Sequence, residues 1–341
     1  MTASDHWTKY SRQVLFSGIG EAGQRRLLQA RVAVIGCGAL GSAQASALAR
    51  AGVGTLRIID RDFVEESNLQ RQMLFDEADA RDALPKAVAA ERRLSRINSR
   101  IRIEGMVEDL VPGNVEKLLG GFDLFLDGTD NFETRRLIND VAVKDGRPWV
   151  YGAVVGSYGV TMAIVPGQTA CFSCLAEGQA TAAEETCDTV GVISPAVSWV
   201  AALQVNQALQ LLVGAWSAGK ARLHRADLWR EEFHSSLVPR PRSDCRTCGA
   251  RDFLYLAGEA RPHITLCGRN AVQIHESGRR FDLPRLRQRL AAHGEVRANP
   301  FLLRLRVPPY ELTVFADGRA IIVGTTDPAV ARSVYARFLG A

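Results

Sequence analysis

The chain has 341 residues and a mass of 37.2 kDa; 47% of its residues are hydrophobic and 23% are charged. This balance is typical of a globular protein and excludes a disordered, collagen-like or disulfide-scaffold chain. The formal net charge of +5 is mild, and its positive excess lies after residue 250. Because no nucleic-acid-binding motif accompanies this excess, the charge does not predict a nucleic-acid partner.

The sequence predicts neither a membrane span nor a secretory signal. The longest apolar stretch, from Ser194 to Gly214, is interrupted by glutamines and an asparagine, whereas a span needs about 18 or more consecutive apolar residues. The first six residues show no basic segment followed by an apolar one. We therefore expect a cytoplasmic protein, in which the seven cysteines are metal ligands, catalytic thiols or core residues rather than disulfides.

Predicted strands and helices alternate over the first half of the chain. After a short helical region within residues 5–29, a buried strand at 31–35 leads into a glycine-rich loop and a helix that ends at residue 50. The elements that follow are strand 55–60, helix 85–98, strand 101–106, strand 123–127, helix 132–144 and strand 149–153. Strands joined by helices in this way predict a doubly wound, mostly parallel α/β sheet of the Rossmann-like type.

The pattern changes after residue 156. A strand at 159–165, a cysteine-containing loop and a long helix at about 195–213 complete the first part of the chain. The last part reads as a small α+β domain, with helices at 283–292 and 328–339 and strands at 302–306, 311–315 and 320–323. We expect two domains, residues 1–250 and 251–341, with the junction marked by the proline-containing segment 239–242.

A GxGxxG motif, formed by Gly36, Gly38 and Gly41, lies between the first strand and the helix that follows it. Glycines permit a tight turn and a close approach of the backbone to phosphate, and the helix N-terminus presents free N–H groups. Asp60, at the end of the next strand, is placed to accept ribose hydroxyls. Alone, the motif indicates a nucleotide, most commonly NAD, or else a glycine-rich turn without a ligand.

The segment after Asp60 is unlike that of a dehydrogenase, because cationic side chains follow it. Arg71 and Lys86 are suited to clamp a polyphosphate, the arginine by its bidentate fork and the lysine as a point charge. Two added cations suit a triphosphate under attack, in which charge spreads over the phosphate oxygens. Asp130, at another strand tip, is a carboxylate suited to Mg²⁺. Taken singly, Arg71 and Lys86 are equally consistent with a solvated surface; with the glycine loop they favour ATP.

Two CxxC pairs, Cys171 with Cys174 and Cys245 with Cys248, offer four thiolates for one tetrahedral site. The pairs are farther apart than in a zinc ribbon, so a shared metal would tie the sheet domain to the segment after residue 240. A redox pair and unliganded cysteines are the alternatives. Because the chain shows no other redox context, the spacing favours structural Zn²⁺.

Three cysteines remain. Cys37, inside the glycine loop, is expected to be a small filler, and Cys267 is expected to be a core residue of the tail. Cys187 lies in a polar, acidic loop, where a thiol is either a nucleophile or an unreactive side chain. Composition alone leaves these two readings open.

Taken together, these motifs resemble the ThiF/MoeB/HesA family, the prokaryotic relatives of ubiquitin-activating enzymes. The matching segments cover roughly residues 5–250, and the C-terminal tail resembles the extension of longer ThiF-type enzymes of thiamine thiazole synthesis. The segments are Tyr10–Gln13, the loop GCGALG at 36–41, Asp60 with Ser67–Gln72, Pro85–Lys86, Asp127–Asn131, both CxxC pairs and Thr186–Cys187.

The resemblance implies an adenylyltransferase that binds ATP, Mg²⁺ and Zn²⁺ and activates the C-terminal carboxylate of a ubiquitin-fold sulfur-carrier protein ending in Gly-Gly. Asp130 would coordinate Mg²⁺. Arg12 would reach into the neighbouring subunit's site, so a homodimer is implied, and Cys187 would link to the carrier or receive sulfur. The implied nucleotide-binding residues are Gly36, Gly38, Gly41, Asp60, Asn68, Arg71, Lys86, Asp130 and Asn131.

The resemblance leaves the carrier open. The carrier of thiamine thiazole synthesis is the first choice, followed by a molybdopterin-type carrier and by a ribosomally made peptide. No sulfurtransferase domain is evident in the tail, so a separate protein must donate the sulfur. An NAD-dependent oxidoreductase is disfavoured by Arg71 and Lys86, and a non-catalytic dimer partner is disfavoured because the residues of the ATP site are all present.

Overall fold

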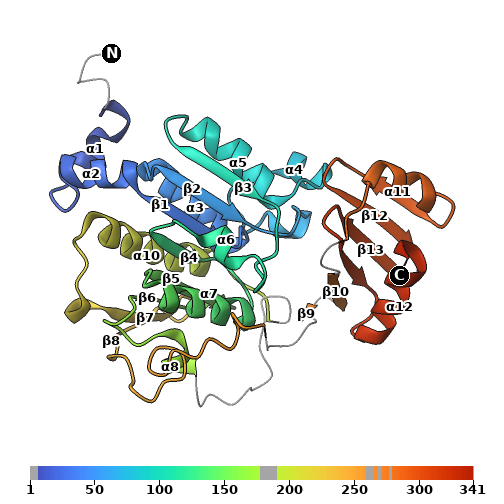
Figure 1. The fold of residues 1–341 in the computed structure, drawn as a ribbon. Helices are drawn as coiled ribbons and strands as arrows, with labels where there is room; N and C mark the ends of the chain where they lie inside the picture. The colour runs from blue at the N-terminus through green and yellow to red at the C-terminus, as the bar shows by residue number, and fades with distance from the viewer. Residues whose placement is uncertain (1–6, 177–189, 259–263, 267–269, 276–278, 341) are drawn as a thin grey trace. The chain divides into compact units, whose positions relative to one another are not determined.

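The computed structural model describes residues 7–176, 190–258, 264–266, 270–275 and 279–340 (Figure 1). These residues form two compact units, which are described one at a time. The larger unit comprises residues 7–176 and 192–258, and the smaller unit comprises residues 190–191 and the described residues from 264 onward.

An eight-stranded sheet forms the centre of the larger unit, in the order β3-β2-β1-β4-β5-β6-β7-β8. The strands from β3 to β5 in this order run parallel, and β6, β7 and β8 are antiparallel to their neighbours. The strands are β1 (Arg31–Ile35), β2 (Thr55–Ile59), β3 (Arg102–Met106), β4 (Leu124–Asp127), β5 (Trp149–Val155), β6 (Tyr158–Ile164), β7 (Arg222–Asp227) and β8 (Glu232–Leu237).

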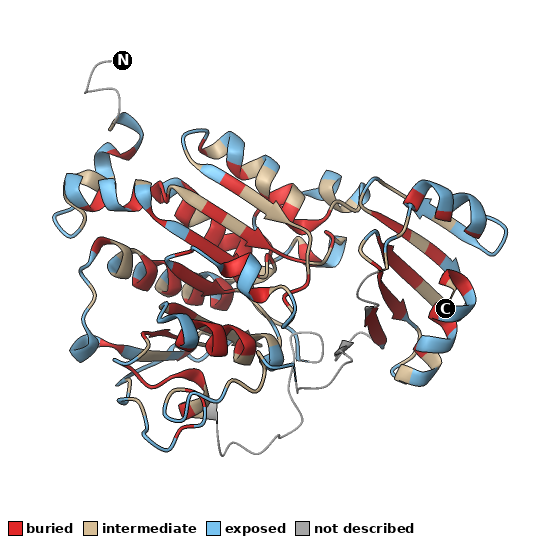
Figure 2. Cartoon of the chain, in the orientation of Figure 1, coloured by how far each residue is buried: buried red, intermediate tan, exposed pale blue. Residues whose placement is uncertain are grey.

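Helices cover both faces of this sheet because its central strands are apolar on both sides. Val32 and Val34 of β1 belong to one buried cluster, with residues of α3, α5 and α10, whereas Ala33 and Ile35 belong to another, with residues of α6 and α7. Figure 2 shows these buried strands between the helices. The helices and 3₁₀ turns are η1 (Thr8–Tyr10), α1 (Ser11–Val14), α2 (Gly20–Gln29), α3 (Ala39–Ala51), η2 (Glu66–Asn68), α4 (Glu77–Arg81), α5 (Lys86–Ile97), α6 (Val115–Leu119), α7 (Phe132–Asp145), α8 (Phe172–Ala176), α10 (Ser194–Val213) and η3 (Ala218–Lys220).

The doubly wound, mostly parallel sheet predicted from the sequence is therefore confirmed. The predicted strands and helices up to residue 213 are present, with ends that differ by at most two residues. The hairpin of β7 and β8 was not predicted. Every residue of β8 is exposed, so this edge strand lacks the alternation of apolar and polar residues by which a half-buried strand is recognised.

Helix α10 is, among the described residues, the one helix long and apolar enough to cross a membrane by length and composition, and half of its apolar stretch is buried. It packs along β5, β6 and α3. Its buried Gln204 donates hydrogen bonds to the backbone oxygens of Asp127, at 2.9 Å, and Val150, at 3.2 Å. These contacts identify α10 as a core helix of the sheet.

The smaller unit is a six-stranded antiparallel sheet in the order β11-β12-β13-β14-β10-β9. Leu286 of α11 and Phe338 of α12 belong to one buried cluster with residues of β10, β12, β13 and β14, and residues of β11 pack against it. The predicted small α+β domain is thus confirmed, although β9, β10 and β11 were not predicted. Its elements are β9 (Ile264–Leu266), β10 (Ala271–His275), α11 (Leu283–Leu290), β11 (Glu295–Ala298), β12 (Leu302–Val307), β13 (Tyr310–Phe315), β14 (Arg319–Val323) and α12 (Pro328–Leu339).

Residues 251–258, which the sequence analysis grouped with the C-terminal part, contact the larger unit. Asp140 of α7 accepts hydrogen bonds from the backbone N–H groups of Tyr255, at 2.9 Å, and Leu256, at 3.2 Å. Arg136 donates a hydrogen bond to the Tyr255 hydroxyl at 2.6 Å. The segment that follows the second cysteine pair is thus held on α7.

Candidate functional site

The glycine loop lies where the order of the parallel strands reverses. Strand β1 has β2 on one side and β4 on the other, and the helices after β1 and β4 pack on opposite faces of the sheet. The chain therefore leaves these two strands toward opposite faces of the sheet at their carboxyl ends, where doubly wound sheets have a crevice between the diverging helices. Open α/β sheets bind their ligands in such a crevice.

The three glycines of the motif have different roles. An added Cβ at Gly41 would lie 1.8 Å from the backbone oxygen of Gly36, and one at Gly36 would lie 2.6 Å from the backbone oxygen of Gly128. Gly36 also has a φ of +84°, which favours glycine. At Gly38, by contrast, the nearest atom to an added Cβ is Nε2 of Gln72 at 3.9 Å. Gly36 and Gly41 are needed for packing, and Gly38 leaves open backbone beside the crevice.

Asp60 joins the glycine loop to the segment that follows β2. Its Oδ2 accepts a hydrogen bond from the backbone N–H of Cys37 at 2.5 Å, and its Oδ1 accepts one from Asp62 at 2.7 Å. Burial raises the pKa of Asp60, and the nearby charge of Lys86 opposes this rise. Each carboxylate oxygen has a second lone pair, so these bonds leave acceptor capacity for a hydroxyl.

Lys86 is the first residue of α5 and is buried, with Asp62 as its ionic partner. Its Nζ lies 3.3 Å from Oδ2 of Asp62, and its backbone N–H donates to the backbone oxygen of Asp62 at 2.9 Å. The structure thus brings the glycine loop, Asp60 and Lys86 together, as the sequence predicted.

Asn68 and Arg71 belong to the turn around η2. The buried Asn68 uses its Oδ1 to accept the backbone N–H of Glu65 at 3.1 Å. Arg71 donates to the backbone oxygen of Ser67 at 2.9 Å. Both side chains therefore make hydrogen bonds within their own turn, and their predicted contacts with phosphates remain predictions.

Two aspartates at the end of β4 differ sharply in environment. Asp127 is fully buried and accepts hydrogen bonds from Arg135 at 3.0 Å and from the hydroxyl of Thr129 at 2.6 Å. Asp130 is exposed, and its charge acts on the guanidinium of Arg61. Asn131 caps α7, since its Oδ1 accepts the backbone N–H of Thr134 at 2.8 Å. Asp130 is therefore the carboxylate at this strand end that is open to a cation, and the side chain of Asn131 already has a structural role.

The other two predicted catalytic residues lie away from this cluster. Arg12 is exposed on α1, beside Leu15 and Phe16, whose exposed fractions are 73% and 64%. Cys187 lies outside the described residues, as does Cys267. Cys37 is a buried side chain of the glycine loop, as expected, and burial raises the pKa of its thiol.

The four cysteines of the two CxxC pairs meet in one place. Their sulfur atoms all lie within 4.8 Å of one another, in an arrangement that could hold a metal ion. The Sγ–Sγ distances are 3.8 Å for Cys171 with Cys174, 3.6 Å for Cys171 with Cys245 and 3.4 Å for Cys174 with Cys248. A tetrahedral zinc with Zn–S bonds of about 2.3 Å places its sulfurs about 3.8 Å apart, and these three distances lie near that value.

Helix α7 supports this cluster from one side. Asn139 accepts the backbone N–H of Phe172 at 2.9 Å, next to Cys171. Ser173 and Thr247, one from each CxxC pair, have hydroxyl oxygens 2.9 Å apart. Asp140 is buried, and burial raises its pKa to about 6. Because α7 begins beside Asp130, one helix connects the predicted Mg²⁺ ligand with the cysteine cluster.

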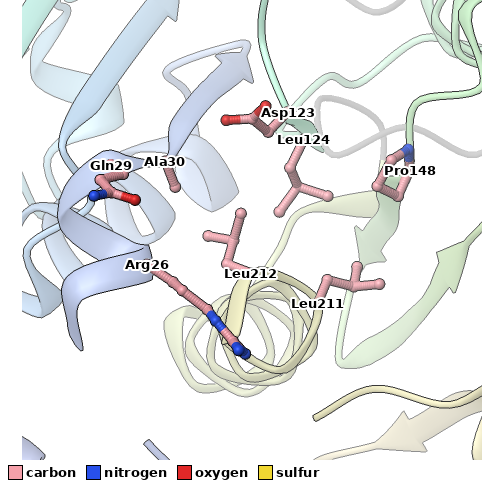
Figure 3. Close-up of a pocket in the computed structure, with 8 residues that line it drawn as sticks. All are labelled: Arg26, Gln29, Ala30, Asp123, Leu124, Pro148, Leu211 and Leu212. Atoms are coloured by element: carbon pink, nitrogen blue, oxygen red, sulfur yellow. The ribbon is translucent and has the colours of Figure 1, made fainter. Parts of the chain in front are cut away.

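Two surface hollows lie outside the crevice. One of about 320 Å³ is lined by Arg26 of α2, Leu212 of α10 and Leu124 at the start of β4, and Figure 3 shows these side chains around it. It lies at the amino ends of the strands, opposite the glycine loop. A second, of about 600 Å³, is lined by residues between Leu69 and Arg81. Neither hollow includes the glycine loop, so the candidate site is identified by its side chains and topology.

Comparison with known proteins agrees with this geometry. The model of the ThiF family matches residues 10–247 of the chain. The chain belongs to the ThiF family.

A ThiF-family relative from Bacillus subtilis (strain 168), named sulfur carrier protein ThiS adenylyltransferase, is 46% identical over 336 residues, which cover 97% of this chain and 99% of the relative. The protein of the same name from Escherichia coli (strain K12) is 37% identical over 71% of this chain and 94% of its own length. Among solved structures, E. coli MccB bound to MccA-N7isoASN has a TM-score of 0.63 at 24% identity, covering 71% of this chain and 74% of that one. This structural likeness shows the shared fold.

Sequence reasoning missed several buried polar residues that support the ThiF-family site. Arg61 donates to Asp109 at 2.9 Å, and Arg135 holds Asp127. Gln44 of α3 donates to Gln204 of α10 at 2.6 Å. Gln44, Arg135 and Gln204 sit in helices without a motif, and Arg61 sits in the loop after β2. The one available signal was a polar residue within an apolar stretch, as at Gln204.

The different roles of the glycines predict different effects of alanine. Gly41→Ala should lower the free energy of unfolding by about 2 kcal/mol or more, because the methyl group would overlap the backbone of Gly36. Gly38→Ala, the matched control, should leave the unfolding midpoint in denaturant nearly unchanged. Equal midpoints for Gly41→Ala and wild type would contradict the packing described for this loop.

Proposed function

We propose that this chain catalyses the ATP-dependent adenylation of the C-terminal Gly-Gly carboxylate of a ubiquitin-fold sulfur-carrier protein, in the synthesis of the thiamine thiazole. The observation that carries the proposal is the cluster of the glycine loop, Asp60 and Lys86 at the strand crossover of a ThiF-family chain. The end-to-end alignment with the B. subtilis relative, which includes the C-terminal unit, supports the same substrate class.

The reaction needs positioning and charge neutralisation. A carrier carboxylate oxygen attacks the α-phosphorus of ATP, the bond between that phosphorus and the bridging oxygen breaks, and pyrophosphate leaves with the bond's electron pair. The product is an acyl-adenylate. Both reactants are anions, and negative charge spreads over the phosphate oxygens during attack, so cations and backbone N–H groups supply most of the stabilisation.

The residues of the crevice suit these tasks. Gly38 leaves open backbone against which the phosphates can lie, at the N-terminus of α3. Asp60 retains acceptor capacity for the ribose hydroxyls. Lys86 supplies a buried positive charge, and we assign Asn68 and Arg71 to the phosphates after a rotation out of their own turn.

We assign Mg²⁺ to Asp130. Its exposed carboxylate provides the hard oxygen ligand that this ion prefers, whereas Asp127 is already saturated by hydrogen bonds. When bound, the ion would neutralise phosphate charge. The positive charge of Arg61 interacts with the Asp130 carboxylate at the end of β4.

A protein substrate is supported by an exposed apolar surface at the same edge of the sheet. Strand β5 ends at this edge, and the turn after it is joined to the β7–β8 turn, because Leu228 donates its backbone N–H to the oxygen of Ser157 at 2.9 Å. Trp229 and Phe233 on this hairpin are 80% and 57% exposed. A globular partner seated there would bring its C-terminal tail along the strand ends toward the glycine loop.

The first prediction of this proposal concerns Lys86. Lys86→Ala should reduce carrier-dependent exchange of pyrophosphate into ATP by about tenfold or more, because the substitution removes a charge-assisted contact to the phosphates. Lys144→Ala removes an exposed lysine of α7 that pairs with Glu116 of α6, and this variant should exchange like wild type. Wild-type exchange in the Lys86 variant would remove this residue from the mechanism.

Exchange assayed with thiamine-type carriers, molybdopterin-type carriers and short peptides also identifies the substrate. We expect turnover with the thiamine-type carrier and loss of turnover when its last glycine is deleted. Turnover with the molybdopterin-type carrier alone, or with a peptide alone, would contradict the assignment to thiamine synthesis. It would still support adenylation of a carboxylate. Absence of exchange with every acceptor, in a folded protein that binds Mg·ATP, would refute the proposed function.

We propose that the cysteine cluster holds structural Zn²⁺. Four thiolates leave no open position for water, so the metal would join the two CxxC segments without acting as a Lewis acid. Cys171→Ser should lower the zinc content, measured by plasma mass spectrometry, and reduce the melting temperature. Cys37→Ala is the control, since that cysteine lies in the glycine loop. Retention of about one zinc per chain by the Cys171 variant would contradict the assignment.

We propose that Arg12 acts in the site of a second subunit. Its place beside the exposed Leu15 and Phe16 supports burial of α1 in a homodimer. A mixture of Arg12→Ala and Lys86→Ala chains should then regain activity, because each mixed dimer has one site with both residues intact. Subunit exchange is verified by mass; a mixture that exchanges subunits and stays no more active than its parents would refute a shared site.

We propose that Cys187 acts after adenylation, because the adenylation step uses no thiol. Sulfur would come from a separate donor protein. Cys187→Ala should keep pyrophosphate exchange near the wild-type rate and reduce thiocarboxylate formation in a complete sulfur-transfer assay. Loss of exchange with the fold and zinc retained would place the thiol earlier, and full activity in both assays would make it an ordinary loop residue.

A further inference from the structure

A chain of hydrogen bonds links the glycine loop to the side chain of Lys86. The backbone N–H of Cys37 donates to Asp60, the other oxygen of Asp60 accepts the backbone N–H of Asp62, and Asp62 in turn pairs with Lys86. The loop that faces the phosphates and the lysine that neutralises them are therefore linked through two aspartates.

Backbone hydrogen bonds also fix the position of Lys86 relative to Asp62. Lys86 donates its backbone N–H to Asp62 at 2.9 Å, and Val64 donates its own to Leu84 at 2.8 Å. An antiparallel bridge joins Phe63 and Pro85 between them. This short ladder holds the first residue of α5 against the segment after β2, so the Lys86 side chain starts from a fixed position.

The two charged partners differ in their access to solvent. The side chain of Lys86 is 4% exposed and that of Asp62 is 23% exposed. Asp62 also lies 3.9 Å from Nε of Arg61, through its other oxygen. A buried ammonium without a counter-charge is costly, whereas Asp62 would keep both water and Arg61 if Lys86 turned to another anion.

We propose that Asp62 is a positioning residue for Lys86: it balances and orients the buried ammonium before ATP binds and yields it to a phosphate oxygen of ATP. The inference rests on the proposed function, because it gives Lys86 the same role. Asp62 itself remains beside Arg61 and touches no reacting atom. Its negative charge has two opposing effects, since it competes with ATP for Lys86 and also keeps Lys86 aligned for the reaction.

The test compares Asp62→Asn, Lys86→Ala, the double variant and Glu116→Gln, which breaks an exposed lysine–carboxylate pair on α6 and α7. Asp62→Asn retains the size of the side chain and the main-chain ladder, and circular dichroism melting verifies the fold. We expect Mg·ATP to bind this variant about threefold more tightly in calorimetry, because a competing charge is lost. We expect its kcat for exchange to fall about tenfold, the effect of one charge-assisted hydrogen bond.

Opposite changes in affinity and kcat distinguish positioning from a structural role, which would weaken both. The double variant should be no slower than Lys86→Ala, since Asp62 acts through the lysine, and Glu116→Gln should match wild type. The inference would be overturned if Asp62→Asn lowered kcat as much in the Lys86→Ala background as in the wild-type background. Weaker Mg·ATP binding by Asp62→Asn, or an unchanged kcat, would also overturn it. Inactive wild type would refute the proposed function instead, and the calorimetric cycle would still measure the Asp62–Lys86 coupling.

Discussion

The larger unit depends on the close approach of two backbone loops, the one after β1 and the one after β4. Gly36, Gly41 and Gly128 meet there with no space for a side chain on any of them. This contact brings the N-terminus of α3 against the sheet and aligns the ends of both strands. The crevice between the diverging helices α3 and α7 is a consequence, and so is the proximity of Asp60 to the glycine loop.

Most charged side chains around this crevice are paired with one another, but Lys86 and Asp130 remain available to a ligand. Asp127 is satisfied by Arg135 and Thr129, and Asp109 by Arg61. Lys86 is held by a partner with access to water, and Asp130 is exposed. A site in which every charge had a buried, saturated partner would have little free energy to gain from ATP, because each new contact would cost an old one. The structure instead keeps one buried cation and one exposed carboxylate ready for exchange.

The fold class, the meeting of the four cysteines and the proximity of Asp60 and Lys86 to the glycine loop were predictable because they depend on local patterns. The β-branched run at 31–35, the glycine spacing and the two CxxC pairs each specify short-range geometry, and together they carried the family resemblance. What remained hidden depends on contacts between distant segments. Asn131 was predicted to bind the nucleotide, and in the structure its side chain caps α7. Gly38 belongs to the same motif as Gly36 and Gly41, but of these three glycines it alone has space for a Cβ atom. The support of the cysteine cluster by Asn139 and Asp140 joins residues more than thirty positions apart, which no motif could indicate.

In the proposed reaction, the residues around the glycine loop join a carrier's terminal carboxylate to the adenylyl group of ATP. Intact-mass spectrometry tests it directly: the wild-type protein is incubated with Mg·ATP, pyrophosphatase and a ubiquitin-fold carrier ending in Gly-Gly, and the carrier is weighed. We expect the carrier to be heavier by one adenylyl group, and we expect no such increase in a carrier that lacks the last glycine. A carrier of unchanged mass, with ATP bound and the protein folded, would contradict it.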